Sequence, residues 1–271
     1  MMRAVVIGAG NVASHLALAI DKVAEVCQVV ARHDESARAL AASIASSRGE
    51  GAVAPLATAD YAEVVADADY YIISVNDDSV AGVAASLPEV KGIVAHTSGS
   101  VPMEVLSRFA NHGVFYPLQT FSRDRELSVE GVPFFIEANT PDNVSRLKEL
   151  AEAIGGRTFD ANSDARATLH LAAVFACNYA NLMWHISSDI LARKGYEFEV
   201  FAPLMRETLS KAAASGPANA QTGPAMRGDL AVINKHLAAL DGDAKQIYQL
   251  LAESIMKRHG VNTQHNEQDT I

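Results

Sequence analysis

The sequence predicts an α/β protein in which a doubly wound, mostly parallel sheet is followed by an all-α C-terminal domain. Three observations predict this fold class. Short β-branched runs alternate with alanine-rich helical segments up to residue 160. From Ser163 to Gly195 the chain has no internal proline or glycine, and apolar residues recur at helical spacing. No strand pattern follows. We therefore expect a sheet domain over residues 1–160, a helical domain over residues 161–262 and a loose tail over residues 263–271.

The first strand, Arg3–Ile7, runs directly into two glycines one residue apart. Gly8 permits a tight turn, Gly10 lets a diphosphate approach the backbone, and Ala13 lets the next helix pack closely. A G-x-G-x-x-A pattern between a strand and a helix is typical of a Rossmann dinucleotide-binding turn, and the alternative is an ordinary glycine turn. The expected cofactor contacts lie in the turn and the first helical residues, where backbone N–H groups face the phosphates: Gly8, Gly10, Asn11 and Val12.

The second predicted strand, residues 25–31, ends in two basic residues, Arg32 and His33. An acidic side chain at this point holds a ribose 2′-hydroxyl, whereas a basic one accepts a 2′-phosphate. Asp34 comes next and is expected to cap the following helix, on which Arg38 could assist. The sequence therefore favours NADP over NAD. The alternative is that Arg32 is a solvated strand end.

Two later strands also end in polar residues. The apolar run 69–75 is typical of a strand buried on both faces, and residues 92–96 form the next strand. Because ligands bind outside the carboxyl ends of such strands, we expect cofactor contacts from Val75, Asn76, Thr97 and Ser98. His96 is a candidate proton donor, with a structural histidine as the favoured alternative. Residues 77–79 are expected to cap a helix.

The rest of the first domain carries fewer signals. Pro117 breaks the strand expected within residues 114–121, and Gln119 and Thr120 then form either a wall of the substrate cleft or a plain structural crossing. Further elements are expected at residues 53–57 (strand), 61–66 (helix), 132–137 (strand), 141–154 (helix) and 157–159 (edge strand).

Polar residues interrupt the apolar surface of the long helix expected after residue 163. At 3.6 residues per turn they share one broad face: His170, Asn178, Asn181 and His185. Such a stripe either lines a cleft or forms a hydrogen-bonded buried network.

A second signal in the helical half is the segment 221–229, in which threonine and glycine precede Pro224 at a helix start. Exposed amides, the hydroxyl of Thr222 and the guanidinium of Arg227 would suit a substrate carboxylate. The alternative is a capped helix start in which Arg227 pairs with Asp229.

At this point five stretches of the chain resemble a known family: GAGNVA (8–13), HTSGS (96–100), FYPLQTFS (115–122), LHLAAVFACN (169–178) and TGPAMRGD (222–229). The family comprises Rossmann-like NADP oxidoreductases whose C-terminal half is a domain of unknown function. The resemblance implies two domains and a homodimer formed through the helical domain.

More distantly, the layout is similar to pyrroline-5-carboxylate reductases and to the β-hydroxyacid dehydrogenases, which include a C-terminal domain like that of 6-phosphogluconate dehydrogenase. The reductases hold the substrate carboxylate at a comparable helix start, which implies that Thr222 and the neighbouring amides, such as that of Gly223, bind the carboxylate. Arg227 and Asn181 are further candidates for substrate contacts. The dehydrogenases use a lysine on the long helix, but this chain has no lysine between Ile154 and Arg193. His170 is then the best proton donor by residue type, and Asn178 its orienting partner.

Composition limits the function classes. The chain has 271 residues and a formal net charge of −10, which argues against nucleic acid or an anionic membrane as a partner. No apolar run is long enough to span a membrane, and the first strand starts too early to leave room for a signal peptide. Cys27 and Cys177 lie in apolar segments and are expected to be buried reduced thiols. We therefore expect a cytoplasmic protein without a metal site.

These observations predict an NADP-dependent reductase of a small carboxylate-bearing imine or ketone, with its active site in an interdomain cleft. The alternative from another class is a non-catalytic NADP(H)-binding sensor or regulatory protein. A third hypothesis is a deazaflavin-dependent NADP reductase, which absorbance of a bound deazaflavin would identify.

Overall fold

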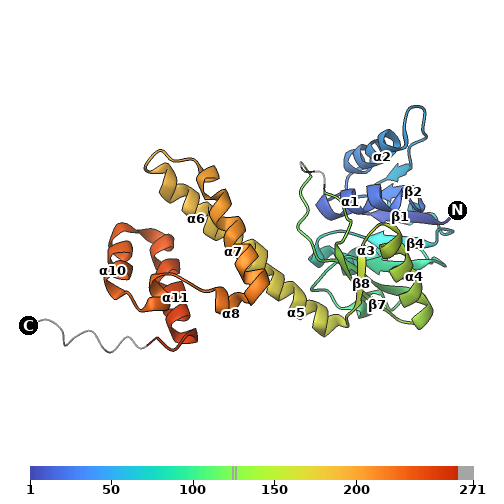
Figure 1. Ribbon diagram of the computed structural model, residues 1–271. Coiled ribbons are helices and arrows are strands. Elements are labelled where there is room, and N and C mark those ends of the chain that lie inside the picture. The colour runs from blue at the N-terminus through green and yellow to red at the C-terminus, as the bar shows by residue number, and fades with distance from the viewer. Residues whose placement is uncertain (124, 126, 262–271) are drawn as a thin grey trace, which may run out of the picture. The chain divides into compact units, whose positions relative to one another are not determined.

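The computed structural model describes residues 1–123, 125 and 127–261 (Figure 1). The tail predicted for residues 263–271 lies outside this part of the chain. By contacts the chain divides into two compact units, residues 1–179 and residues 180 onward, and each is described here by itself. The division expected at residue 160 stays a prediction.

The first unit is built on an eight-stranded sheet with the order β3-β2-β1-β4-β5-β6-β7-β8. Neighbouring strands from β3 to β6 are parallel, β7 is antiparallel to β6, and β8 is parallel to β7. The order reverses between β1 and β4, so the predicted doubly wound, mostly parallel sheet is confirmed. The strands are β1 (Arg3–Ile7), β2 (Glu25–Val30), β3 (Leu56–Thr58), β4 (Tyr70–Ile73), β5 (Ile93–His96), β6 (His112–Pro117), β7 (Pro133–Ala138) and β8 (Arg157–Asp160).

Helices cover both faces of this sheet (Figure 1). In β1, Ala4 and Val6 face one apolar cluster, whereas Val5 and Ile7 face the other. This alternation explains why the strand is apolar from Ala4 to Ile7. On the first face lie α1 (Asn11–Ile20), α2 (Asp34–Arg48) and α4 (Pro141–Ala153), and on the second lie α3 (Asp77–Ser86) and the 3₁₀ turns Tyr61–Glu63 and Met103–Leu106.

Several boundaries differ from the expected ones. The helix expected at residues 61–66 is a single 3₁₀ turn, because Val64 turns to extended backbone and buries its side chain. Asp34 is the first residue of α2 rather than its cap, which is His33. With Glu35 it puts negative charge in the first helical turn, where the helix dipole favours it.

The long helical segment after residue 163 runs without a break, as the missing glycine and proline predict. It consists of α5 (Ser163–Ala173), a π-helical turn (Val174–Tyr179) and α6 (Ala180–Ala192). The π turn changes the angular spacing, so the face that His170 was expected to share with Asn178 and Asn181 is not continuous. Both asparagines and His185 are exposed, which does not fit a buried network.

The second unit is all-α in its described residues, as predicted, and its small core contains Ala225, Ile233, Ala252 and Met256. The helix expected to start at Pro224 ends at Arg227, before Gly228, which has φ 68°. Asp229 then caps the next helix, accepting the Val232 N–H at 3.1 Å. After α6, this unit contains a 3₁₀ turn (Phe198–Phe201), α7 (Ala202–Ser215), α8 (Pro217–Ala220), α9 (Pro224–Arg227), α10 (Leu230–Ala239) and α11 (Gly242–Arg258).

Among the residues that the structure describes, no helix combines the length and apolar character that crossing a membrane requires.

Candidate functional site

The turn between β1 and α1 is fixed by Gly8. Its φ of 124° is unfavourable for other residues, and a Cβ here would lie 2.0 Å from the Ser74 carbonyl oxygen. The Gly8 N–H donates to the Val30 carbonyl oxygen at 2.7 Å. The turn is therefore packed between the ends of β2 and β4, at the point where the strand order reverses.

Gly10 has open surroundings. Apart from its chain neighbours, no atom of the described residues lies within 4 Å of the position that a Cβ would take. It precedes α1, whose first turn carries no acidic residue and receives no side-chain cap from the described residues. The first N–H groups of α1 thus have no side-chain acceptor among the described residues, and the helix dipole favours an anion there. This arrangement fits the diphosphate of a dinucleotide, which the glycine pattern predicts.

Arg32 and His33 are both exposed where β2 ends, next to β1 in the sheet. Burial raises the pKa of Tyr61, while the charge of Arg32 opposes that shift, so the guanidinium lies near this phenol. Arg38, expected to assist, instead pairs with Asp34 at 3.1 Å, and both side chains are exposed. Arg32 thus lies exposed after the carboxyl end of β2, where the sequence predicts the contact with a 2′-phosphate.

The residues after β4 and β5 hold the two strand ends together. The Thr97 hydroxyl donates to Ser74 Oγ at 3.1 Å. Ser98 Oγ accepts the N–H groups of Ser100 and Val101 at 3.1 and 3.0 Å, so this hydroxyl shapes its own loop.

Val75 and Asn76 continue from the end of β4. Val75 is half-buried beside Gly8, and Asn76 precedes the first residue of α3. Both therefore lie next to the glycine turn.

His96 is fully buried at the end of β5. Its Nδ1 accepts the Ser98 N–H at 3.2 Å, and its Nε2 has no hydrogen-bond partner among the residues with described positions. Burial, followed by repulsion from Arg166, lowers the pKa of His96 to about 4. The imidazole is therefore neutral near pH 7, which favours the structural interpretation over the proton donor.

We expect His96 to make stability depend on pH. A folded-state pKa of about 4, below the ordinary 6.5, means that the unfolded chain binds the proton first as pH falls. Stability is then full above pH 6.5 and is lost towards pH 4, by about 3 kcal/mol. Urea unfolding at several pH values should show this loss reduced in His96→Gln. Parallel curves for the two proteins would contradict the assignment.

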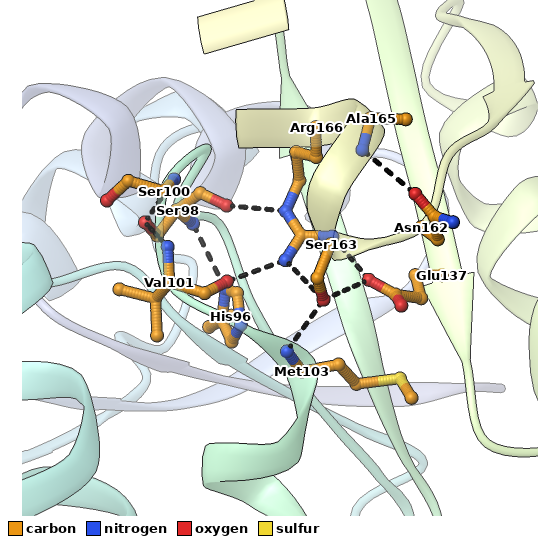
Figure 2. A network of polar contacts seen from close by, with 10 residues as sticks. All are labelled: His96, Ser98, Ser100, Val101, Met103, Glu137, Asn162, Ser163, Ala165 and Arg166. Atoms are coloured by element: carbon orange, nitrogen blue, oxygen red, sulfur yellow. Dashed lines mark hydrogen bonds and ion pairs between the residues drawn. The ribbon is translucent and has the colours of Figure 1, made fainter. Parts of the chain in front are cut away.

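Arg166, in α5, is the largest fully buried side chain of the first unit and joins three segments (Figure 2). Its Nε donates to the Ser98 carbonyl oxygen at 3.2 Å, and its Nη2 donates to that of Val101 at 2.6 Å. Its Nη1 pairs with Glu137 of β7, whose carboxylate also accepts the Ser163 hydroxyl at 2.9 Å. The start of α5 is thereby fixed to the loop after β5.

One helical turn further, α5 carries His170 to the same loop. The Tyr116 hydroxyl and His170 Nδ1 lie 3.1 Å apart, and a Cβ on Gly99 would come within 2.9 Å of both side chains. Burial, and then the negative charge of Asp77, raise the pKa of Tyr116. Asp77 in turn accepts a hydrogen bond from Ser100 Oγ. A histidine, a phenol and a carboxylate thus surround the loop after β5, at the carboxyl edge of the sheet.

Sequence reasoning named His170 as a candidate but did not name its neighbours here, Tyr116, Asp77 and Arg166. The order of the strands could have indicated Tyr116, since β6 follows β5 and the tyrosine is the last residue before Pro117. Asp77 was expected only to cap a helix.

The other candidates belong to other segments of the chain. Asn178 is exposed in the π turn of the first unit. The second unit contains Asn181, Thr222, Gly223 and Arg227, of which Gly223 has φ 108° and the other three are exposed.

The two cysteines differ. Cys27 is buried as expected, but the expectation for Cys177 is wrong, because the π turn leaves it exposed. Over the described part of the chain, no group of three or more His, Cys, Asp or Glu side chains could hold a metal ion.

Comparison with known proteins identifies relatives of both halves. Residues 3–97 match the model of the "NADP oxidoreductase coenzyme F420-dependent" family, and residues 132–255 match a domain of unknown function, DUF2520. A crystal structure described as a "putative NADP oxidoreductase" from Bacteroides fragilis is 39% identical, covers 95% of this chain and 98% of its own, and has a TM-score of 0.83. Curated protein sequences give no match.

More distant structures share the fold. Pyrroline-5-carboxylate reductase from Streptococcus pyogenes is 14% identical over 95% of this chain and 98% of its own, with a TM-score of 0.59. Reductive aminase from Aspergillus terreus, in complex with NADPH and ethyl-5-oxohexanoate, is 15% identical over 96% and 88%, with a TM-score of 0.60.

Proposed function

The chain belongs to the family of NADP oxidoreductases, and we propose that it reduces a small carboxylate-bearing imine or ketone with NADPH. One observation carries the proposal: His170, hydrogen-bonded to Tyr116, lies at the carboxyl edge of the same sheet whose first turn has the open Gly10. A cofactor turn and a group that can donate a proton are the two parts that such a reduction needs.

The cofactor is held by the residues at the carboxyl edge of the sheet. The first N–H groups of α1, from Asn11 and Val12, bind the diphosphate over Gly8 and Gly10. Arg32 and His33 bind the 2′-phosphate. The remaining contacts come from the ends of β4 and β5: Val75, Asn76, Thr97 and Ser98. NADPH supplies a hydride when it is bound.

His170 donates the proton that the nitrogen or oxygen of the substrate gains on reduction, since imidazoles exchange protons near neutral pH. The Tyr116 hydroxyl, at Nδ1, fixes the orientation of the ring and leaves Nε2 for the substrate. In the proposal Asn178 assists in orienting the substrate.

The substrate carboxylate is bound by the second unit in this proposal. Its proposed contacts are the N–H groups and hydroxyl of Thr222 and Gly223, the guanidinium of Arg227 and the side-chain amide of Asn181. The reaction then takes place in a cleft between the two domains. The fold is shared with an imine reductase from Pseudomonas sp. and with pyrroline-5-carboxylate reductase, so cyclic imines belong among the first compounds to test.

The helices after residue 163 expose many large apolar side chains, which isolated soluble domains rarely do. We propose that a second copy of the chain covers them in a homodimer. They include Leu171, Phe175, Tyr179, Leu182, Trp184, Leu204 and Leu209.

The experiment that tests this function follows NADPH oxidation at 340 nm with a panel of keto acids and cyclic imino acids, beside calorimetry of NADPH binding. Turnover of at least one carboxylate-bearing compound is expected. NADPH binding without turnover would instead favour the sensor, which the absence of a lysine between Ile154 and Arg193 motivates. No binding of either NADPH or NADH would contradict both.

Arg32→Ala should lower the affinity for NADPH roughly tenfold or more and leave that for NADH unchanged, because only NADPH carries the 2′-phosphate. Calorimetric dissociation constants for both cofactors measure this. Lys91→Ala is the matched control, since it removes one exposed positive charge shortly before β5, at the amino edge of the sheet. Equal affinities of the unmutated protein for the two cofactors would contradict the role of Arg32.

A further inference from the structure

A segment far along the chain returns to the glycine turn. After β6, residues 118–123 cross to the start of α1, where Asn11 Nδ2 donates to the Phe121 carbonyl oxygen at 3.1 Å. The buried Phe121 ring packs against His15, with ring centroids 5.1 Å apart, and against Ala19. His15 Nε2 also lies 3.0 Å from the Arg125 carbonyl oxygen. These contacts fix the segment to α1.

This anchoring brings Arg123 to the turn itself. Its Nη2 donates to the carbonyl oxygen of Ala9, the residue between Gly8 and Gly10. A guanidinium has five N–H donors, so one bond to a carbonyl leaves most of them for another acceptor. The side chain is exposed, and a hollow of about 1080 Å³ opens beside it, lined by Ala9, Ser14 and Ser36 among others.

The charge of this guanidinium matters because the chain as a whole is acidic, with a net charge of −10. Among the described residues no side chain caps the first turn of α1, so without a cation two phosphates there would depend on N–H groups and the helix dipole. An arginine offers charge-assisted hydrogen bonds in a planar fork that matches phosphate oxygens.

We propose that Arg123 binds the diphosphate of the pyridine dinucleotide. The phosphate site then has two parts, the backbone of the glycine turn and the side chain that residues 118–123 bring to it. The inference rests on the proposed function, since it needs a dinucleotide in that turn. Arg123 and Arg32 then have different tasks. Arg32 distinguishes NADPH from NADH, whereas Arg123 binds a group that both cofactors contain.

Dissociation constants of the full-length protein for NADPH and NADH, measured by calorimetry, test this assignment. Arg123→Ala should weaken the binding of both cofactors by the same factor, about tenfold. Arg123→Gln should weaken the binding of both cofactors similarly, although its amide can still donate to the Ala9 carbonyl oxygen and hold the segment. Arg123→Lys should recover part of the affinity, because it keeps the charge but not the fork. Lys91→Ala should bind both cofactors like the unmutated protein.

The outcomes separate the two proposals. If the unmutated protein binds NADPH but Arg123→Ala and Arg123→Gln bind within twofold of it, the role of Arg123 is wrong and the proposed function stands. A loss for NADPH alone would make Arg123 a ligand of the 2′-phosphate and would overturn the diphosphate assignment. If Arg123→Ala loses affinity while Arg123→Gln does not, the residue only holds the segment, which also overturns it. No binding by the unmutated protein overturns both proposals.

Discussion

Arg166→Met is expected to lower the free energy of unfolding by about 3–5 kcal/mol. The substitution leaves the Glu137 carboxylate, whose side chain is 15% exposed, without its cation. It also removes the donor from the carbonyl oxygens of Ser98 and Val101. An unpaired buried charge and unsatisfied acceptors cost more than the pair itself contributes. Urea unfolding at pH 7 measures the difference.

Two further variants identify the cause. Arg38→Met removes an arginine whose partner, Asp34, is exposed, and should change stability by less than about 1 kcal/mol. Adding Glu137→Gln to Arg166→Met removes the buried charge and should restore part of the loss. A cost for Arg166→Met as small as that of Arg38→Met would show that the buried pair does not stabilise the fold.

The same variant tests how the site is assembled. Arg166 fixes the first turn of α5 to the loop after β5, and His170 follows one turn later on the same helix. Loosening that attachment should therefore reduce any reductase activity by more than the fraction of unfolded protein accounts for. NADPH binding at the glycine turn should change less.

The features that the sequence predicted well depend on neighbouring residues. Gly8 was assigned to the turn because a strand and a helix flank it, and the structure gives it φ 124°. The long helix was predicted because nothing between Ser163 and Gly195 interrupts it. In each case the chain within a few residues decides the conformation.

The features that were missed depend on distant residues. The partners of Arg166 in β7 and in the loop after β5 are 29 to 68 positions away, so its burial leaves no local pattern. The pairing of Tyr116 with His170 spans 54 positions. In the sequence, an arginine three residues after the start of a capped helix cannot be told from a solvent-exposed one. Its burial results from the packing of β7 and the loop after β5 around it.

The π turn shows a third kind of failure. A stripe of polar residues was expected on one face at 3.6 residues per turn, but the wider turn at Val174–Tyr179 alters the phase of everything beyond it. Its residues differ little from those of an ordinary helix, so neither the exposed Cys177 nor the position of Asn178 could be read from periodicity.

His170→Asn should lower kcat of the reductase by about 10²–10⁴ while leaving the dissociation constant of NADPH unchanged. Asparagine can keep a hydrogen bond to the Tyr116 hydroxyl, which lies 3.1 Å from His170 Nδ1, but it cannot exchange a proton. The variant therefore removes the proposed chemistry and preserves the packing against Gly99. Steady-state kinetics with the best compound of the panel measures the loss.

The second unit contains a matched control. His236 Nδ1 lies 2.8 Å from the Tyr248 hydroxyl, a pair like that of His170 and Tyr116 but in another part of the chain. His236→Asn should leave kcat within about twofold of the unmutated enzyme. A large loss of kcat confined to His170→Asn then reports the loss of proton donation rather than of a histidine–tyrosine hydrogen bond. A kcat of His170→Asn within threefold of the unmutated enzyme would exclude His170 as the proton donor.

Tyr116→Phe then distinguishes orientation from proton donation. If the hydroxyl only orients the imidazole, kcat should fall about tenfold and its pH dependence should shift, since His170 still donates the proton but no longer has a partner at Nδ1. If Tyr116→Phe instead loses as much activity as His170→Asn, the phenol is itself the donor. Its raised pKa would keep it protonated near pH 7, and the histidine would be the positioning residue.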